Sequence, residues 1–139
     1  MIDESINIYL LNKSPDTFNT IMTELEKGEL PSMENIDKII KNGDIILIDS
    51  LGRYLDYTVQ NITNNFNIYN LSDTDIEIIK AILLHIVDDE EEILKLYESI
   101  DKKYVLINYF LNSIDYDRFT ELLESYGDEE SIEYLIQLD

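Results

Sequence analysis

Apolar side chains recur every three or four residues along most of the chain, which is the spacing of one face of an α-helix. Ser14 and Pro15 begin one such segment, because serine caps helices and proline fits their first turn. Gly28 follows the last apolar position, where a helix-ending glycine belongs. The apolar face of this segment consists of Phe18, Ile21, Met22 and Leu25. The pattern predicts a helix between Pro15 and Gly28.

Two neighbouring segments carry related signals. The apolar run 6–11 favours a short helix or irregular structure over a strand, since a lone strand has no partner to pair with. Ser32 is placed to cap a helix that ends at Gly43, and Asp44 can cap the helix after it.

The segment after Asp44 is ambiguous. Residues 45–48 are aliphatic and prone to form a strand, yet the helical period continues beyond them. We expect a helix over residues 45–60. The residues around 63–71 are rich in asparagine and are expected to form a loop.

The second half of the chain begins with a capping box, in which Ser72 precedes Asp75 by three residues. Residues 76–87 are apolar on almost every side and predict a central, buried helix that includes His85. Four aspartates then each precede a further apolar segment and are expected to cap its helix: Asp88, Asp101, Asp115 and Asp128.

The predicted caps of the second half recur with successive spacings of 16, 13, 14 and 13 residues. A shift of 26 residues aligns Ile93 with Phe119 and Leu96 with Leu122. These spacings predict a repeated helix pair of about 27 residues, stacked as in an α-solenoid. The alternative is that any bundle of short helices produces similar spacings.

Residues 39–44 read Ile-Ile-Lys-Asn-Gly-Asp, which resembles the end of an ankyrin helix. The resemblance covers six residues. The predicted unit is shorter than the ankyrin and tetratricopeptide periods, and their consensus residues are absent, so no family follows from it.

Four glycines and two prolines in 139 residues argue against an all-β protein, which needs frequent turn residues. We expect an all-α protein with a single domain over residues 1–139. It should contain about seven to eight short antiparallel helices. Residues 1–71 should form a looser N-terminal half, and residues 72–139 a C-terminal half built from α-solenoid-like helix pairs.

The formal net charge is −20, and from Asp88 onward sixteen Asp and Glu residues face only four Lys and Arg residues. Such a charge repels nucleic acid and anionic membranes, and it attracts a basic partner. The alternative is that the charge serves only solubility. The N-terminus lacks the basic and apolar regions of a signal peptide, and no apolar run is long enough to span a membrane. We expect a cytoplasmic protein.

Residues for catalysis or for a cofactor are scarce. The chain has no cysteine, and its only histidine, His85, falls in the most apolar predicted helix. Asp73, Asp75 and Glu77 alternate as in calcium loops, but the turn glycine and distal glutamate of an EF-hand are missing. The sequence predicts a protein that is not an enzyme and that binds no metal or cofactor.

The carboxylates that exceed the need for helix caps follow Asp88, Asp115 and Asp128, and tyrosines lie among them. Tyrosines among charges are typical of interface anchors, although they can instead fill the core between helices. The residues predicted to bind a partner are Tyr116, Asp117, Glu121, Glu124, Tyr126, Asp128, Glu129, Glu130, Glu91 and Glu92.

We expect an inhibitor or immunity-type protein that neutralises a basic partner, most plausibly a nuclease toxin, without binding nucleic acid itself. In composition and size the chain resembles the acidic immunity proteins of bacterial toxin systems. Two alternatives remain open. One is an interaction module with a hydrophobic groove, of the viral Bcl-2-like type, and the other is a DNA-mimic anti-restriction protein.

Overall fold

The structure, a computed structural model, describes residues 1–138, and in that range helices are the only regular secondary structure apart from one isolated β-bridge. The predicted all-α class is confirmed. The ten helices are α1 (Ile2–Leu11), α2 (Pro15–Glu26), α3 (Met33–Asn42), α4 (Ile45–Gly52), α5 (Val59–Thr63), α6 (Asp73–Leu83), α7 (Glu90–Ser99), α8 (Lys103–Phe110), α9 (Tyr116–Tyr126) and α10 (Glu129–Leu138).

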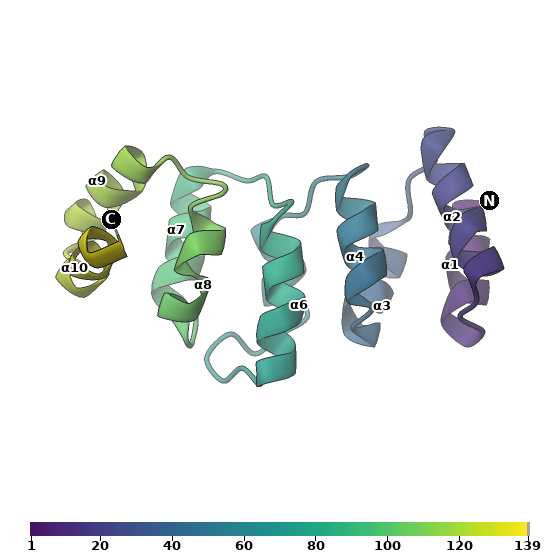
Figure 1. Ribbon diagram of the computed structural model, residues 1–139, viewed down its shortest axis with the longest axis horizontal. Helices are drawn as coiled ribbons and strands as arrows, with labels where there is room; N and C mark the ends of the chain where they lie inside the picture. The colour runs from purple at the N-terminus through teal and green to yellow at the C-terminus, as the bar shows by residue number, and fades with distance from the viewer. Residues whose placement is uncertain (139) are drawn as a thin grey trace.

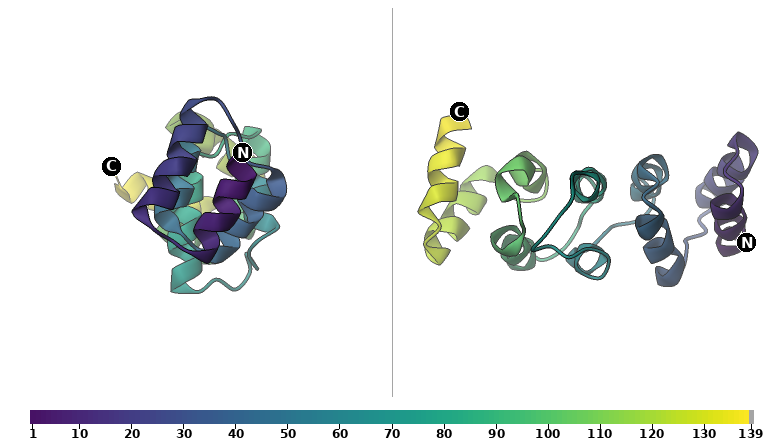
Figure 2. Two further views of the ribbon diagram at one scale, coloured as in Figure 1. Left: turned by 90° about the vertical axis from the view of Figure 1, so that its right-hand side faces the viewer. Right: turned by 90° about the horizontal axis from the view of Figure 1, so that it is seen from below.

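The helices follow one another in chain order along the longest axis, from α1 and α2 at one end to α9 and α10 at the other (Figure 1). Helix α1 packs on α3, and α7 packs on both α5 and α9. Helix α6 in turn packs on α4 and α8. Seen from below, the helices lie in two rows (Figure 2). Each helix therefore packs mainly on helices that are close to it in the sequence.

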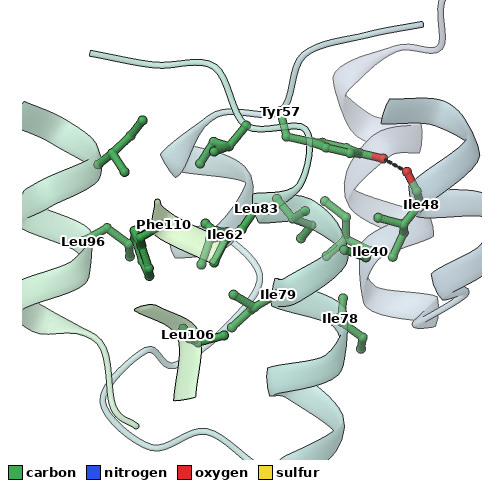
Figure 3. Close-up of a cluster of buried hydrophobic side chains, with 14 of the residues drawn as sticks. Ile40, Ile48, Tyr57, Ile62, Ile78, Ile79, Leu83, Leu96, Leu106 and Phe110 are labelled. Atoms are coloured by element: carbon green, nitrogen blue, oxygen red, sulfur yellow. Dashed lines mark hydrogen bonds between the residues drawn. The ribbon is translucent and has the colours of Figure 1, made fainter. Parts of the chain in front are cut away.

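The core is made almost entirely of isoleucine, leucine and aromatic side chains, and it extends from Ile2 to Leu135. Its middle part joins the helices α3 to α8 (Figure 3). Tyr57 is buried there, and its hydroxyl donates a hydrogen bond of 2.6 Å to the backbone carbonyl of Ile48. The phenol thus fills core volume while its polar group keeps a partner, as a buried hydroxyl requires.

Most predicted caps are confirmed, because a cap depends on residues that are close in sequence. The side chains of Ser14, Ser32, Asp44, Ser72 and Asp115 accept hydrogen bonds from backbone N–H groups in the first turns of their helices. Asp128 accepts one from the backbone N–H of Ser131 in the same way.

Two predicted caps are wrong. Helix α7 is capped by Asp89, whereas Asp88 accepts hydrogen bonds from the backbone N–H groups of Asp89 and Val59. Asp101 does not cap α8 either, because its carboxylate accepts from the backbone N–H of Leu71. The position before α8 is taken by Lys102, whose φ of 56° lies in the left-handed region. In both cases the aspartate accepts a hydrogen bond from a distant backbone segment instead of capping the helix that follows it: Asp88 from the first residue of α5, and Asp101 from the loop before α6.

The expected helix over 45–60 is wrong in its length. Residues 45–48 are helical and not a strand, and Asp44 accepts from the backbone N–H of Leu47 at 3.1 Å. However, α4 ends at Gly52, and the short α5 forms separately, so the chain has more helices than the seven to eight expected. Between them the chain crosses the end of α6, where Tyr57 forms a parallel β-bridge with Ile86.

His85 lies just beyond α6 and not inside a helix over 76–87, so this expectation is also wrong. Its ring Nε2 is 2.8 Å from a carboxylate oxygen of Asp49 on α4. The prediction that this helix is buried and central is nevertheless confirmed, since most of its aliphatic side chains belong to the core. The predicted loop over 63–71 follows α5 directly, and its first residue, Thr63, is the last of that helix.

Candidate protein-binding surface

Helix α9 is divided into an apolar and an acidic face. Its buried face consists of Phe119, Leu122 and Leu123. The opposite face carries Asp117, Glu121 and Glu124, and all three are exposed. These carboxylates are four and three residues apart, which places them on one side of the helix. The packing of α9 against the core therefore turns three negative charges toward solvent.

Helix α7 adds carboxylates beside this face, because it packs against α9. Glu91 and Glu92 are exposed in its first turn. Arg118 of α9 joins the two helices, with its Nε 3.5 Å from Glu90 and an Nη 3.7 Å from Glu121. We use the name acidic surface for seven exposed carboxylates of α7, α9 and the first turn of α10: Glu91, Glu92, Asp117, Glu121, Glu124, Glu129 and Glu130.

Asp128 and Glu130, two of the predicted binding residues, are engaged within the protein. Asp128 accepts from the hydroxyl of Ser131 at 2.8 Å and lies 3.5 Å from the Lys103 ammonium. These hydrogen bonds and the lysine charge lower the pKa of Asp128 even though burial opposes them. Glu130 accepts from the hydroxyl of Tyr104 at 3.1 Å. Asp128 therefore stabilises the contact between α8 and α10, and Glu130 is shared between that contact and the surface.

The tyrosines of α9 and α10 divide into two groups. Tyr126 is 45% exposed and lies next to the acidic surface. Tyr116 and Tyr134 are partly buried and pack against the core. The ring of Tyr134 lies 5.0 Å from that of Tyr104, between α8 and α10. Tyr126 is thus the predicted aromatic residue best placed to contact a partner.

A polar network surrounds Asp128, and no pattern in the sequence predicted it. The Tyr97 hydroxyl lies 3.1 Å from the hydroxyl of Ser131, and burial raises the pKa of Tyr97 to about 12. Lys103 lies over the Tyr97 ring at 5.7 Å. Burial also raises the pKa of Glu98, with a contribution from the nearby charge of Asp128. These residues are far apart in the sequence, so no local pattern indicates that they meet.

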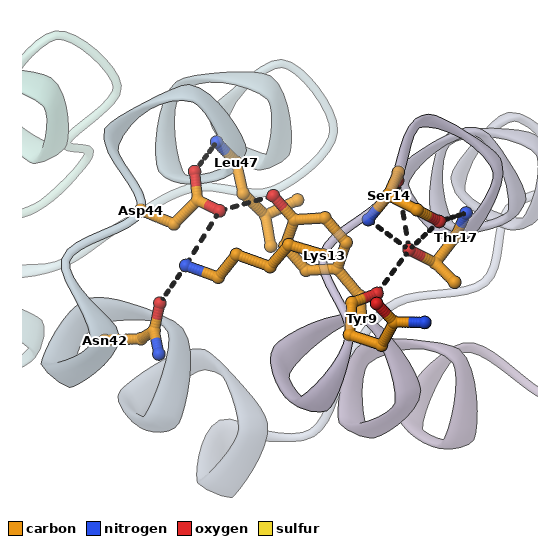
Figure 4. A network of polar contacts seen from close by, with 8 residues as sticks. Tyr9, Lys13, Ser14, Thr17, Asn42, Asp44 and Leu47 are labelled. Carbon is orange, nitrogen blue, oxygen red and sulfur yellow. Dashed lines mark hydrogen bonds and ion pairs between the residues drawn. The ribbon is translucent and has the colours of Figure 1, made fainter.

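A similar network lies at the other end of the molecule (Figure 4). The Tyr9 hydroxyl donates to Asp44, the residue that caps α4, and Lys13 lies 3.5 Å from the same carboxylate. Burial and the contact with Asp44 raise the pKa of Tyr9 to about 12. Tyr9 and Tyr97 are both the eighth residue of their helices. A tyrosine, a lysine and a capping aspartate therefore come together twice.

The protein's own cations are largely paired. At least eight of the ten Lys and Arg side chains lie within 4 Å of a carboxylate in residues 1–138. Thirty carboxylates are present in the chain, so most have no cation of this protein as a partner. On the acidic surface this leaves five carboxylates without an ion pair among the described residues: Glu91, Asp117, Glu124, Glu129 and Glu130.

A groove on α4, α6 and α8 is a second surface feature that was not predicted from the sequence. It has a volume of about 450 Å³, and its apolar walls include Ile45, Ile46, Leu84 and Tyr109. The aliphatic run 45–48 was the available sequence signal for this groove. Ile45 and Ile46 of the run remain exposed on α4, whereas the other apolar side chains of that helix are buried.

Within residues 1–138, no three His, Asp or Glu side chains gather where they could hold a metal ion. In the same range every helix is too short or too polar to cross a lipid bilayer. Comparison with family models, characterised proteins and solved structures gave no match to the chain.

Proposed function

We propose that the protein is a non-enzymatic, immunity-type inhibitor that binds a basic protein through the acidic surface. The observation that carries the proposal is the exposed stripe of Asp117, Glu121 and Glu124 on α9, next to the first turn of α7. Within residues 1–138, Arg118 pairs with Glu121 of this stripe, and Lys95 pairs with Glu92 of α7. Carboxylates without cations of their own are available to the cations of a partner, and their summed field speeds encounter.

A basic nuclease toxin is the partner class that fits this surface best. A nuclease binds phosphates with Lys and Arg side chains, and a row of carboxylates can occupy those same side chains. Tyr126 would supply an aromatic anchor at the edge of the contact. We place this interaction in the cytoplasm, and the protein itself would not bind nucleic acid.

We further propose that the fold is a row of antiparallel helix pairs, as in an α-solenoid, along the whole chain. The capping positions of the second helix of each pair support this, since they are 30, 28, 30 and 26 residues apart: Ser14, Asp44, Ser72, Lys102 and Asp128. The recurrence of the Tyr9–Asp44 contact as Tyr97–Ser131–Asp128 is a second support. Such a row offers an extended binding surface.

Charge reversal tests the function. The variant D117K/E121K/E124K should lose binding to the basic partner, and the product of the neighbouring reading frame is the first partner to test. Three exposed reversals elsewhere, E4K/E26K/D56K, change the net charge equally and serve as the matched control. We expect the α9 variant to weaken the affinity at least about tenfold more than the control variant, as measured by titration calorimetry. Equal losses would reject the acidic surface as the binding site.

A further inference from the structure

The groove on α4, α6 and α8 exposes aliphatic side chains to solvent. Ile46 is 72% exposed and Leu84 48% exposed, and both line the groove together with Tyr109. Side chains of this size normally turn inward on short helices that pack on a core. Their presence around one depression, on helices that pack side by side, indicates a surface that another molecule covers.

The apolar surface continues beyond this groove. A second depression, of about 330 Å³, lies between α4 and the helices α1 and α2, and Tyr9, Phe18 and Ile46 line it. Ile46 belongs to both depressions, so they form one apolar track from the end of the row formed by α1 and α2 to its middle (Figure 1). The track is separate from the acidic surface, which lies toward the end formed by α9 and α10 (Figure 1).

The charged residues of the groove neutralise one another. Arg53 pairs with Asp49 at 3.7 Å, and Lys80 pairs with Glu77 at 3.2 Å. Lys80 also lies over the ring of Tyr109 at 5.5 Å. The groove is therefore locally neutral and apolar, within a protein whose net charge is −20. An occupant would find apolar contacts in the groove and a negative field around it.

We propose that the groove binds an amphipathic helix with aliphatic residues on one face and Lys or Arg residues on the other. The walls are helices, and no strand edge is present in residues 1–138 for an extended segment to pair with. A helix satisfies its own backbone hydrogen bonds and presents anchors every three or four residues. A second copy of this chain is disfavoured, because two molecules of charge −20 repel each other.

This inference rests on the proposed function in one respect, since the helix would belong to the same basic partner. The acidic surface would attract the partner, and the groove would hold its helix. The two contributions are separable because charge reversal on α9 leaves the groove residues intact, and changes in the groove leave the net charge of the acidic surface intact.

Synthetic peptides test the proposal directly. The first probe is a helical peptide with leucines at positions i, i+4 and i+7 and lysines on the opposite face. The second replaces those leucines with serine, and the third replaces the lysines with glutamate. Binding is followed by chemical shift changes of the ¹⁵N-labelled protein. We expect the leucine–lysine peptide to bind tightest and to shift amides of Ile46, Ala81 and Leu84.

Two groove variants, compared with one control variant outside the groove, locate the binding site. I46D and L84D change exposed side chains and should fold normally, and L30D places the same charge at another exposed aliphatic position, outside the groove. The groove variants should weaken binding of the leucine–lysine peptide roughly tenfold or more, while L30D leaves it unchanged.

The inference is overturned if the leucine and serine peptides bind equally, or if the groove amides do not shift. If the serine–lysine peptide loses affinity in D117K/E121K/E124K while no peptide responds to I46D, the acidic surface is supported and the groove rejected. If peptides respond to I46D but not to the α9 variant, the groove is supported and the proposed function fails.

Discussion

At the scale of single residues, the end of α4 lies in close contact with His85, which follows α6. Gly52 ends α4 where the His85 ring approaches it, and a Cβ built on Gly52 would lie 2.2 Å from Cδ2 of that ring. No side chain larger than hydrogen fits there without a shift of the ring or the backbone. His85 is itself held by Asp49, so the ring cannot move without breaking that contact.

We predict that G52A lowers the free energy of unfolding by about 2–4 kcal/mol, since the added methyl group must displace His85. Urea denaturation measures the change. In the background H85G, where all three contacting side-chain atoms of His85 are absent, the same glycine substitution should cost clearly less. Equal costs in both backgrounds would show that the helix, and not the histidine ring, requires glycine at this position.

The stability of the protein should depend on pH through the ionisation of Asp44. Hydrogen bonds from Tyr9 and from the backbone of Leu47, together with the charge of Lys13, hold the pKa of Asp44 below its ordinary value although burial opposes them. A lowered pKa in the folded state means that the ionised carboxylate stabilises the protein above the pKa of the unfolded chain, about 3.9. This stability is lost as the pH falls through the folded-state value.

The variant D44N tests this, because asparagine also caps helices but carries no charge. We expect it to be less stable than the wild type by about 1–2 kcal/mol at pH 7. The difference should shrink as the pH falls below about 4, where the wild-type carboxylate becomes protonated. Thermal melts between pH 7 and pH 3 measure this, and a difference that is constant over the whole range would contradict the assignment.

At the scale of elements, the contact between the α7–α8 and α9–α10 pairs depends on one buried serine. Ser131 is fully buried, and its hydroxyl connects the Tyr97 hydroxyl to the Asp128 carboxylate. The Tyr97 ring also packs against Phe110 and Phe119, with centroids 5.1 and 5.2 Å away. The terminal pair is therefore held by an aromatic cluster and a polar network at the same place.

We predict that S131A costs about 1–3 kcal/mol, because it leaves the Tyr97 hydroxyl buried without its partner. Hydrogen exchange should show faster opening of α9 and α10 than of α4 and α6, since helices here pack mainly on close neighbours. The double variant Y97F/S131A should be less destabilised than the sum of the two single variants. Uniform loss of protection along the chain would contradict this local role.

The elements that could be predicted from sequence are those whose signals are local. Ser14-Pro15 and the Ser72 capping box each act within one turn, so their helices begin where expected. The close approach of His85 to Gly52 at the end of α4 could not be predicted, because the two residues are more than thirty positions apart in the sequence. Asp101 likewise stands where a helix cap is expected, but its carboxylate accepts a hydrogen bond from the backbone N–H of Leu71, which only the fold brings close.

The same division applies to the candidate site. The acidic stripe on α9 could be predicted from the sequence. Asp117, Glu121 and Glu124 are spaced so that they lie opposite the buried apolar residues of the helix. The limits of the acidic surface could not be predicted, because Asp128 pairs with Lys103, which lies on another helix. The groove was missed for the same reason, since Ile46, Leu84 and Tyr109 come from three helices.

At the scale of the whole molecule, the net charge of −20 opposes folding through repulsion among carboxylates. Salt screens this repulsion, with a screening length of about 10 Å at 0.1 M. We predict that the melting temperature rises as the salt concentration increases from about 0.02 to about 0.3 M. A falling melting temperature would show instead that the protein's own ion pairs outweigh the repulsion.

The most direct test of the central claim is the salt dependence of binding to the basic partner. The dissociation constant and the association rate are measured by surface plasmon resonance between about 50 and about 500 mM salt. If the acidic surface carries the interaction, the affinity falls at least about tenfold over this range, and slower association accounts for much of the loss. An affinity and an association rate that do not change with salt would contradict the account.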